Sequence, residues 1–247
     1  MHSLLSALTG LLNQLFGPAV TALLNKLNIY PAHPAAPIQD RLTLQLLVSL
    51  VMVLFFIIVR AMLSVEKPGS LQHLAEMIHE FVDEQAQAVM GQEGYQSHLP
   101  FVTTIPIFTL LCNIMGLLPG IDTPTASPVV PLGIALVTFI YYNYHGVRAQ
   151  GPLGYLRHFM GPVLWISPLM FPIEIISNLT RIMSLTVRLY ANMFASDLLT
   201  LVFFSMIPIA IPVIFLGLHL GVALIQSYVF MLLAMIYLGE ATAHESH

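Results

Sequence analysis

One stretch decides the fold class: residues 42–63, with the sequence LTLQLLVSLVMVLFFIIVRAML. A helix needs about 20 apolar residues to cross the roughly 30 Å hydrocarbon core of a bilayer, and this stretch is long enough. Charged residues bound it on both sides: Asp40, Arg41, Glu66 and Lys67. The stretch therefore predicts a membrane-spanning helix.

The whole chain shares this apolar character. Of its 247 residues, 57% are hydrophobic and only 8% are charged, and the mean hydropathy is +0.84. Soluble proteins carry about 25% charged residues, so a soluble domain and a disordered chain are both excluded. The net charge of -4 excludes nucleic acid as a partner. The single cysteine, Cys112, excludes a disulfide framework and a cysteine-based metal site.

Further apolar segments extend the prediction to an all-α polytopic membrane protein with about five crossings. We expect these crossings near residues 42–63, 101–118, 129–145, 172–206 and 212–239. The Pro119-Gly120 turn ends the second crossing, and the tyrosines at 141, 142 and 144 place the end of the third at the membrane interface. A Gly/Pro-rich loop is expected from Gly146 to Pro162.

The last two crossings are predicted to form a slanted helical hairpin at about residues 172–240. Pro208 and Pro212 form the natural break between them, because proline removes a helix donor and clashes with the preceding turn. A helix over 172–206 would be about 50 Å long. It exceeds the thickness of the bilayer core and must tilt strongly.

Two other segments are predicted to be amphipathic helices that do not cross. Residues 71–90 place apolar side chains on one face, which is typical of a helix in the membrane interface. The opposite face carries the carboxylates of Glu76, Glu80, Asp83 and Glu84. Residues 4–27 are also amphipathic and lack the cationic start of a signal peptide. We therefore expect an outer N-terminal segment, 1–40, and one transmembrane domain, 41–247.

The basic residues of the loops predict the orientation. One side of the membrane carries Arg60, Lys67, Arg148 and Arg157, whereas the other carries Lys26 and Arg41. Because Lys and Arg favour the cytoplasmic side, the N-terminus is predicted outside and the tail at 240–247 inside. The acidic helix over 71–90 then lies on the cytoplasmic surface, against water or a partner protein.

Ionisable residues within membrane spans are costly and mark functional sites. At 100° per residue, six polar residues of the slanted helix fall within an arc of about 80°. This polar stripe consists of Glu174, Ser177, Arg181, Ser184, Arg188 and Asn192. Asp197 follows on the same helix, and His219, Gln226 and Tyr237 share a face of the last helix. Two such stripes on adjacent helices can line aqueous clefts.

Structural explanations remain open for several of these residues. Arg181 can extend to the membrane surface, and Glu174 can favour the start of a helix. Hydrogen bonds between helices can explain Asn192, Gln226, Ser177 and His219. Arg188 differs because it lies in the middle of a helix, where a structural arginine needs a buried carboxylate. No nucleophile constellation, phosphate-binding loop or complete zinc-protease motif is present in the sequence, so we expect no enzyme activity and no cofactor.

The stretch from Pro172 to Leu198, PIEIISNLTRIMSLTVRLYANMFASDL, resembles subunit a of the rotary (F-type) ATP synthase membrane sector. The run NIMGLLP at 113–119 and the pattern of His219, Gln226 and YLGE at 237–240 also fit that family. The resemblance covers about residues 42–240. Ile182, Tyr190 and Ala191 replace the usual proline, phenylalanine and glycine, and leave the charged positions intact.

The resemblance implies a non-catalytic stator with two offset proton half-channels beside a rotating ring of c subunits. It assigns the essential arginine to Arg188, and implies that protons enter from outside by a relay of Asp197, His219, Gln226 and Asn192. Glu174 and Ser177 would line the exit to the cytoplasm. The implied partners are the c ring, the b subunits of the peripheral stalk, the catalytic head and the lipid bilayer. The implied location is a bacterial inner membrane or an organelle energy-coupling membrane, with H⁺ or Na⁺ as the ion.

A self-contained secondary transporter or ion channel is the alternative, with the hairpin as its path. Transporters commonly contain two repeated halves. The chain has no second copy of the motif around Arg188, which favours the stator. A purely structural membrane scaffold would leave the polar stripes unexplained.

Overall fold

The computed structural model describes residues 2–26, 38, 40–64, 69–91, 94–118, 123–160, 167–206 and 210–242. Almost all of these residues are helical, and none of them forms a strand. The predicted all-α fold class is confirmed.

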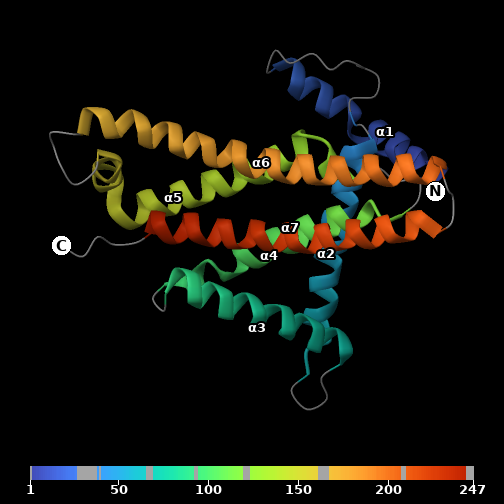
Figure 1. Cartoon of the computed structure of the whole chain (residues 1–247), viewed down its shortest axis with the longest axis horizontal. Coiled ribbons are helices and arrows are strands. Elements are labelled where there is room, and N and C mark those ends of the chain that lie inside the picture. Colours follow the sequence, from blue (N-terminus) through green and yellow to red (C-terminus); the bar gives the residue numbers. More distant parts are fainter. Residues whose placement is uncertain are drawn as a thin grey trace.

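The described part of the chain contains long helices, of which the last two, α6 and α7, form the hairpin. The helices in chain order are α1 (His2–Lys26), α2 (Asp40–Ala61), α3 (Ser70–Met90), α4 (Leu99–Met115), α5 (Val129–Met160), α6 (Ser167–Met206) and α7 (Ala210–Thr242). Short 3₁₀ helices, η1 (Tyr95–Ser97) and η2 (Pro124–Ala126), precede α4 and α5. Figure 1 shows α6 and α7 as a long antiparallel pair, with α2 running across their direction.

The predicted hairpin is present and longer than expected. α6 begins at Ser167 and contains Pro172, and α7 begins at Ala210 with Pro212 in its first turn, where proline is tolerated. Pro208 lies outside the described residues. With 40 residues, α6 is about 60 Å long. If α2 stands along the bilayer normal, its crossed direction relative to α6 and α7 agrees with a strongly tilted hairpin (Figure 1).

The predicted loop at 146–162 is wrong up to Met160, because α5 continues through this segment with a kink. The break is confined to Gly151, whose φ of 76° and ψ of 160° are not helical. Beyond the kink the chain turns back, and the Tyr155 hydroxyl donates to Asn143 Oδ1 at 2.7 Å. A Cβ on Gly146 would lie 2.6 Å from the Tyr155 ring, so glycine there permits close packing rather than a loop.

By length and composition, three helices within the described residues could cross a membrane: Leu5–Lys26, Leu42–Ala61 and Val213–Thr242. The first of these lies in α1, which the sequence placed at the surface. Helix α4 is apolar but shorter, at 17 residues. Helices α5 and α6 are not among these three, so their crossings stay predictions.

The core lies between α4, α5, α6 and α7. One face of α6 is buried at helical spacing, through Ile182, Leu185, Leu189 and Met193. Leu189 and Met193 belong to a cluster that also contains Phe230 of α7 and Ile134 of α5. This packing fixes the rotation of α6, and therefore decides which of its polar residues face α7.

Helix α3 matches the predicted acidic helix. Its buried side, including Val82 and Ala86, packs on Met235 and Leu238 of α7, while Glu76, Glu80 and Glu84 are exposed. A polar face of this kind needs water or a polar partner, which agrees with a surface position.

The predicted orientation can be tested by labelling in a Cys112→Ser background. Because Glu80 is exposed on α3, Glu80→Cys should react with a membrane-impermeant maleimide only from the cytoplasmic side. The exposed Ser205, at the far end of α6, supplies the matched control, and Ser205→Cys should react only from outside. The reverse pattern would contradict the orientation.

Candidate functional site

Arg188 lies in the middle of α6, beside the buried row that contains Leu185 and Leu189. It is partly exposed, and its Nη2 donates only a long hydrogen bond, of 3.4 Å, to the Ser184 hydroxyl. Among the residues that the structure describes, no carboxylate lies within 4.0 Å of its guanidinium. A cation among apolar residues is costly without an anion. Arg188 is therefore available to a carboxylate on another chain.

One turn from Arg188, an amide pair joins the two helices of the hairpin. Asn192 Nδ2 donates to Gln226 Oε1 at 2.8 Å, and Gln226 is buried. The two residues that sequence analysis placed on separate polar stripes are therefore in direct contact. The bond also satisfies polar groups in an apolar region, as the structural explanation requires.

A second polar contact of the hairpin centres on His219, which is only 1% exposed. Its Nδ1 lies 3.4 Å from Asp197 Oδ1 and 2.9 Å from the Ser196 hydroxyl. Its Nε2 lies 3.1 Å from the backbone oxygen of Asn113 on α4. The predicted pairing of Asp197 with His219 is present, and Ser196 is a neighbour that sequence analysis missed.

These contacts assign the protons of the imidazole. A carbonyl oxygen can only accept, so Nε2 carries a hydrogen and donates to Asn113. In the neutral ring, Nδ1 then accepts from the Ser196 hydroxyl; in the charged ring, Nδ1 donates to Asp197. Nδ1 therefore has a polar neighbour in either state, and both ring nitrogens of this buried side chain are hydrogen-bonded.

The α4 side of this cluster is polar and was given no role from the sequence. The Thr125 hydroxyl donates to Asn113 Oδ1 at 2.6 Å, and Asn113 is fully buried. Among the described residues, neither Asn113 Nδ2 nor the Thr109 hydroxyl has a hydrogen-bond partner. Thr109 and Asn113 are four residues apart and so share a face of this largely apolar helix, which is a sequence signal that could have found them.

The other end of the hairpin contains Arg181, whose Nη1 lies 2.7 Å from Glu240 Oε2. The guanidinium also lies 4.8 Å from the centre of the Tyr237 ring. Arg181 therefore fastens α6 to the end of α7. Glu174 and Ser177 are partly buried nearby on α6, but the described contacts join neither of them to this group.

Tyr155, beyond the kink of α5, lies near the same end. Burial raises the pKa of its phenol, Arg181 acts in the opposite direction, and Glu174 adds to the increase. These electrostatic interactions bring Glu174, Arg181 and Tyr155 into one neighbourhood. The hairpin thus carries one polar group around His219 and another around Arg181, and Arg188 lies between them along α6.

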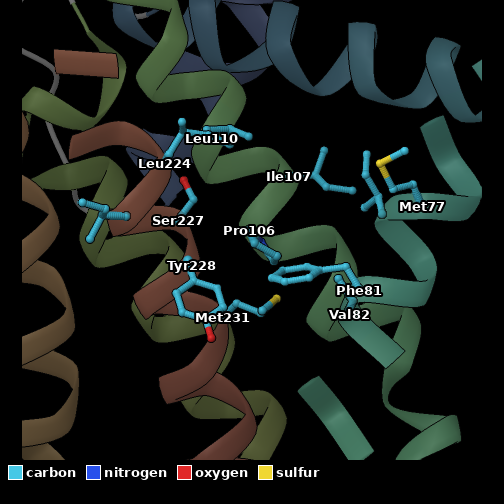
Figure 2. A pocket seen from close by; sticks show the side chains of 12 residues that line it. Met77, Phe81, Val82, Pro106, Ile107, Leu110, Leu224, Ser227, Tyr228 and Met231 are labelled. Carbon is cyan, nitrogen blue, oxygen red and sulfur yellow. The ribbon is translucent and has the colours of Figure 1, made fainter. Parts of the chain in front are cut away.

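An apolar cavity of about 610 Å³ lies on another side of α7, between α3 and α4. Figure 2 shows Phe81, Pro106 and Met231 around it. The Tyr228 hydroxyl at its edge donates to Gln85 Oε1 at 3.1 Å. The lining contains no charged residue and is separate from the polar groups of the hairpin, so this cavity is unsuited to ion passage.

Comparisons with known proteins identify the family of the chain. The sequence model of the family described as "ATP synthase A chain" matches residues 42–239. The chain belongs to this family. All the candidate residues from Glu174 to Gln226 lie within the matched region.

Individual members of the family are similar over most of the chain. It is 52% identical to "ATP synthase subunit a" of Koribacter versatilis over 236 residues, which cover 96% of each chain. It is 45% identical to the protein of the same name from Solibacter usitatus, over 87% of this chain and 91% of that one. For Campylobacter jejuni subsp. doylei the identity is 41%, over 72% and 79%. The resemblance stated from the sequence is confirmed, and the chain is a membrane component of the ATP synthase family.

Proposed function

We propose that this chain is the stator proton channel of a bacterial ATP synthase. It would pass protons through two offset half-channels to and from carboxylates on a rotating c ring. The observation that carries the proposal is Arg188, a cation in the middle of a long apolar helix whose guanidinium has no carboxylate within 4.0 Å among the described residues. A carboxylate that moves past on another chain would satisfy it.

Arginine suits this role because it stays protonated in almost any environment. Beside Arg188, a ring carboxylate would be favoured in its ionised form and would release its proton. The fixed positive charge would also keep protons from passing directly between the half-channels. Both effects require that Arg188 face the ring, and its partial exposure on α6 supports this.

The outer half-channel would use Asp197 and His219. A proton arriving from outside binds the Asp197 carboxylate and then moves to Nδ1 of His219, which leaves a carboxylate and an imidazolium. The imidazolium returns to neutral by releasing that proton toward the ring. The distance of 3.4 Å between Asp197 Oδ1 and His219 Nδ1 supports this transfer. Asn192 and Gln226 would lie beside its inner end.

The inner half-channel would use Glu174 and Ser177, at the opposite end of α6. Glu174 shares its neighbourhood with Tyr155 and Arg181, and the Arg181–Glu240 pair would keep the end of α7 in place beside them. Released protons would leave here for the cytoplasm. A membrane potential of about 150 mV supplies roughly 3.5 kcal/mol per proton, so several protons must be collected for each ATP.

The proposal predicts a stable assembly, which separates it from a self-contained transporter. A complex purified through an affinity tag on this chain should contain a c ring, b subunits and a catalytic head with ATPase activity. The expected partners can be identified by mass spectrometry of the intact complex. A chain that purifies without them and conducts protons alone in liposomes would favour the transporter instead.

A further inference from the structure

Within the described part of the connection between α4 and α5, Thr123 forms a hydrogen bond to the hairpin. Its side chain is 1% exposed, and its hydroxyl donates to Asp197 Oδ1 at 2.9 Å across 74 residues of sequence. The residues that follow it form η2, which packs against α6. The hydroxyl is therefore held at Asp197 by the surrounding packing.

Gly116, at the end of α4, makes this position possible. A Cβ built on Gly116 would lie 1.8 Å from the Thr123 hydroxyl oxygen and 3.2 Å from Cε1 of His219. Its backbone φ is -66°, so the backbone does not require glycine. The reason for glycine is space, because the Thr123 hydroxyl occupies the volume that any other side chain would fill.

The Thr123 hydroxyl binds the carboxylate oxygen of Asp197 that lies nearest to His219. Thr123 bonds to Oδ1 of Asp197, and the same oxygen lies 3.4 Å from His219 Nδ1. A hydrogen bond donated to a carboxylate stabilises its ionised form and fixes its direction. From α7, the titratable group that faces Asp197 is His219; from the side of η2 the described contact is the neutral hydroxyl of Thr123.

We propose that Thr123, seated against Gly116, is a positioning residue that holds Asp197 ionised and directed at His219, and so sets the outer pH range of proton uptake. The inference rests on the proposed function, since it assigns a role within the outer half-channel. It adds two residues, from the α4–α5 connection and the end of α4, that make no contact with Arg188 in the structure.

The test uses the intact complex in proteoliposomes with the catalytic head outside, so that the lumen corresponds to the outer side of the membrane. The rate of ATP synthesis is measured against luminal pH, at constant membrane potential and constant external pH. Thr123→Val keeps the shape of the side chain and removes the donor. Without the donor, Asp197 holds its proton at higher pH, so the luminal pH of half-maximal rate should rise by about one pH unit.

Two further variants test whether the shift comes from the position of the hydroxyl group or from another change in the side chain. Thr123→Ser restores the donor and should return the profile to that of the wild type. Gly116→Ala keeps Thr123 but displaces its hydroxyl, and should shift the profile in the same direction as Thr123→Val. Thr104→Val is the matched control, because the Thr104 hydroxyl is exposed and bonds only to Pro100 O of its own helix; it should cause no shift.

An unshifted profile in assembled Thr123→Val or Gly116→Ala complexes would overturn the inference, as would a Thr123→Ser profile that matches Thr123→Val. If Thr123→Val fails to assemble, the other two variants decide: a shifted profile for Gly116→Ala with a wild-type profile for Thr123→Ser supports the inference, and an unshifted Gly116→Ala profile overturns it. The proposed function fails separately, if complexes with Arg188→Ala still synthesise ATP. An unchanged profile beside an inactive Arg188→Ala complex overturns only the role of Thr123.

Discussion

Arg188→Ala should reduce ATP-driven acidification of inverted membrane vesicles to the background of vesicles that lack the complex. Without the guanidinium, a ring carboxylate could pass the hairpin while still protonated, and protons could cross between the half-channels. Arg188 is partly exposed and does not belong to the buried row that contains Leu185 and Leu189. The complex should therefore still assemble, which immunoblotting of its subunits can check.

Arg188→Lys should lose most of the pumping as well. A lysine ammonium is a point charge that is more readily neutralised on burial, whereas a guanidinium stays charged and presents a planar set of donors. The exposed Arg148 at the end of the first part of α5 offers a matched control, and Arg148→Ala should pump normally. Normal acidification by the Arg188→Ala vesicles would return Arg188 to a structural role.

The second large effect concerns the relay. Asp197→His and His219→Asp should each lower ATP-driven pumping by about 100-fold, the contribution typical of a positioned acid or base. The double variant, which exchanges the two groups, should pump better than either single variant because it restores one carboxylate and one imidazole. Initial rates of acidification, normalised to assembled complex, measure this comparison.

The exchange should not restore the wild-type rate, for a reason that the structure supplies. Nε2 of His219 donates to the backbone oxygen of Asn113, and the carboxylate introduced by His219→Asp has no hydrogen to donate there when ionised. The exposed pair of His73 and Glu76, 3.8 Å apart on α3, is the matched control. Exchanging those two residues should leave pumping unchanged. Normal pumping by both single variants of Asp197 and His219 would exclude the relay.

Much of the fold could be predicted because it depends on local composition. The long apolar runs give α2, α6 and α7 with ends displaced by a few residues, since hydrophobic helices need little beyond length and breaking prolines. The prediction of a loop at 146–162 is wrong up to Met160, because glycine and proline usually interrupt helices whereas α5 continues through this segment. Here the interruption falls on Gly151 alone, and Gly146 serves close packing with Tyr155.

Some residues of the candidate site could also be predicted from the sequence, and others could not. Arg188, Asp197 and His219 stand out because charge is rare in apolar segments, and the resemblance to the family supplied their roles. Thr123 carries no such signal, and Gly116 lies within the family-like run at 113–119 without a role given there. The role proposed for Thr123 comes from a contact with a residue 74 positions away, and neither periodicity nor composition records which distant residues meet. Ser196 could not be predicted either, because its hydroxyl contacts His219 of another helix, whereas a serine on a membrane helix usually bonds to its own backbone.

The length of α6 has a geometric consequence for the direction of force. A helix about 60 Å long within a layer about 30 Å thick advances roughly 1.7 Å sideways for each ångström of depth. Glu174 and Asp197 are therefore about 35 Å apart along the helix axis, of which roughly 30 Å is lateral. Under the proposed function, an ion driven through the thickness of the membrane would travel farther around the membrane plane than across it. The inclined helix would then act as the slope of a screw thread, which turns a voltage along one axis into motion along another.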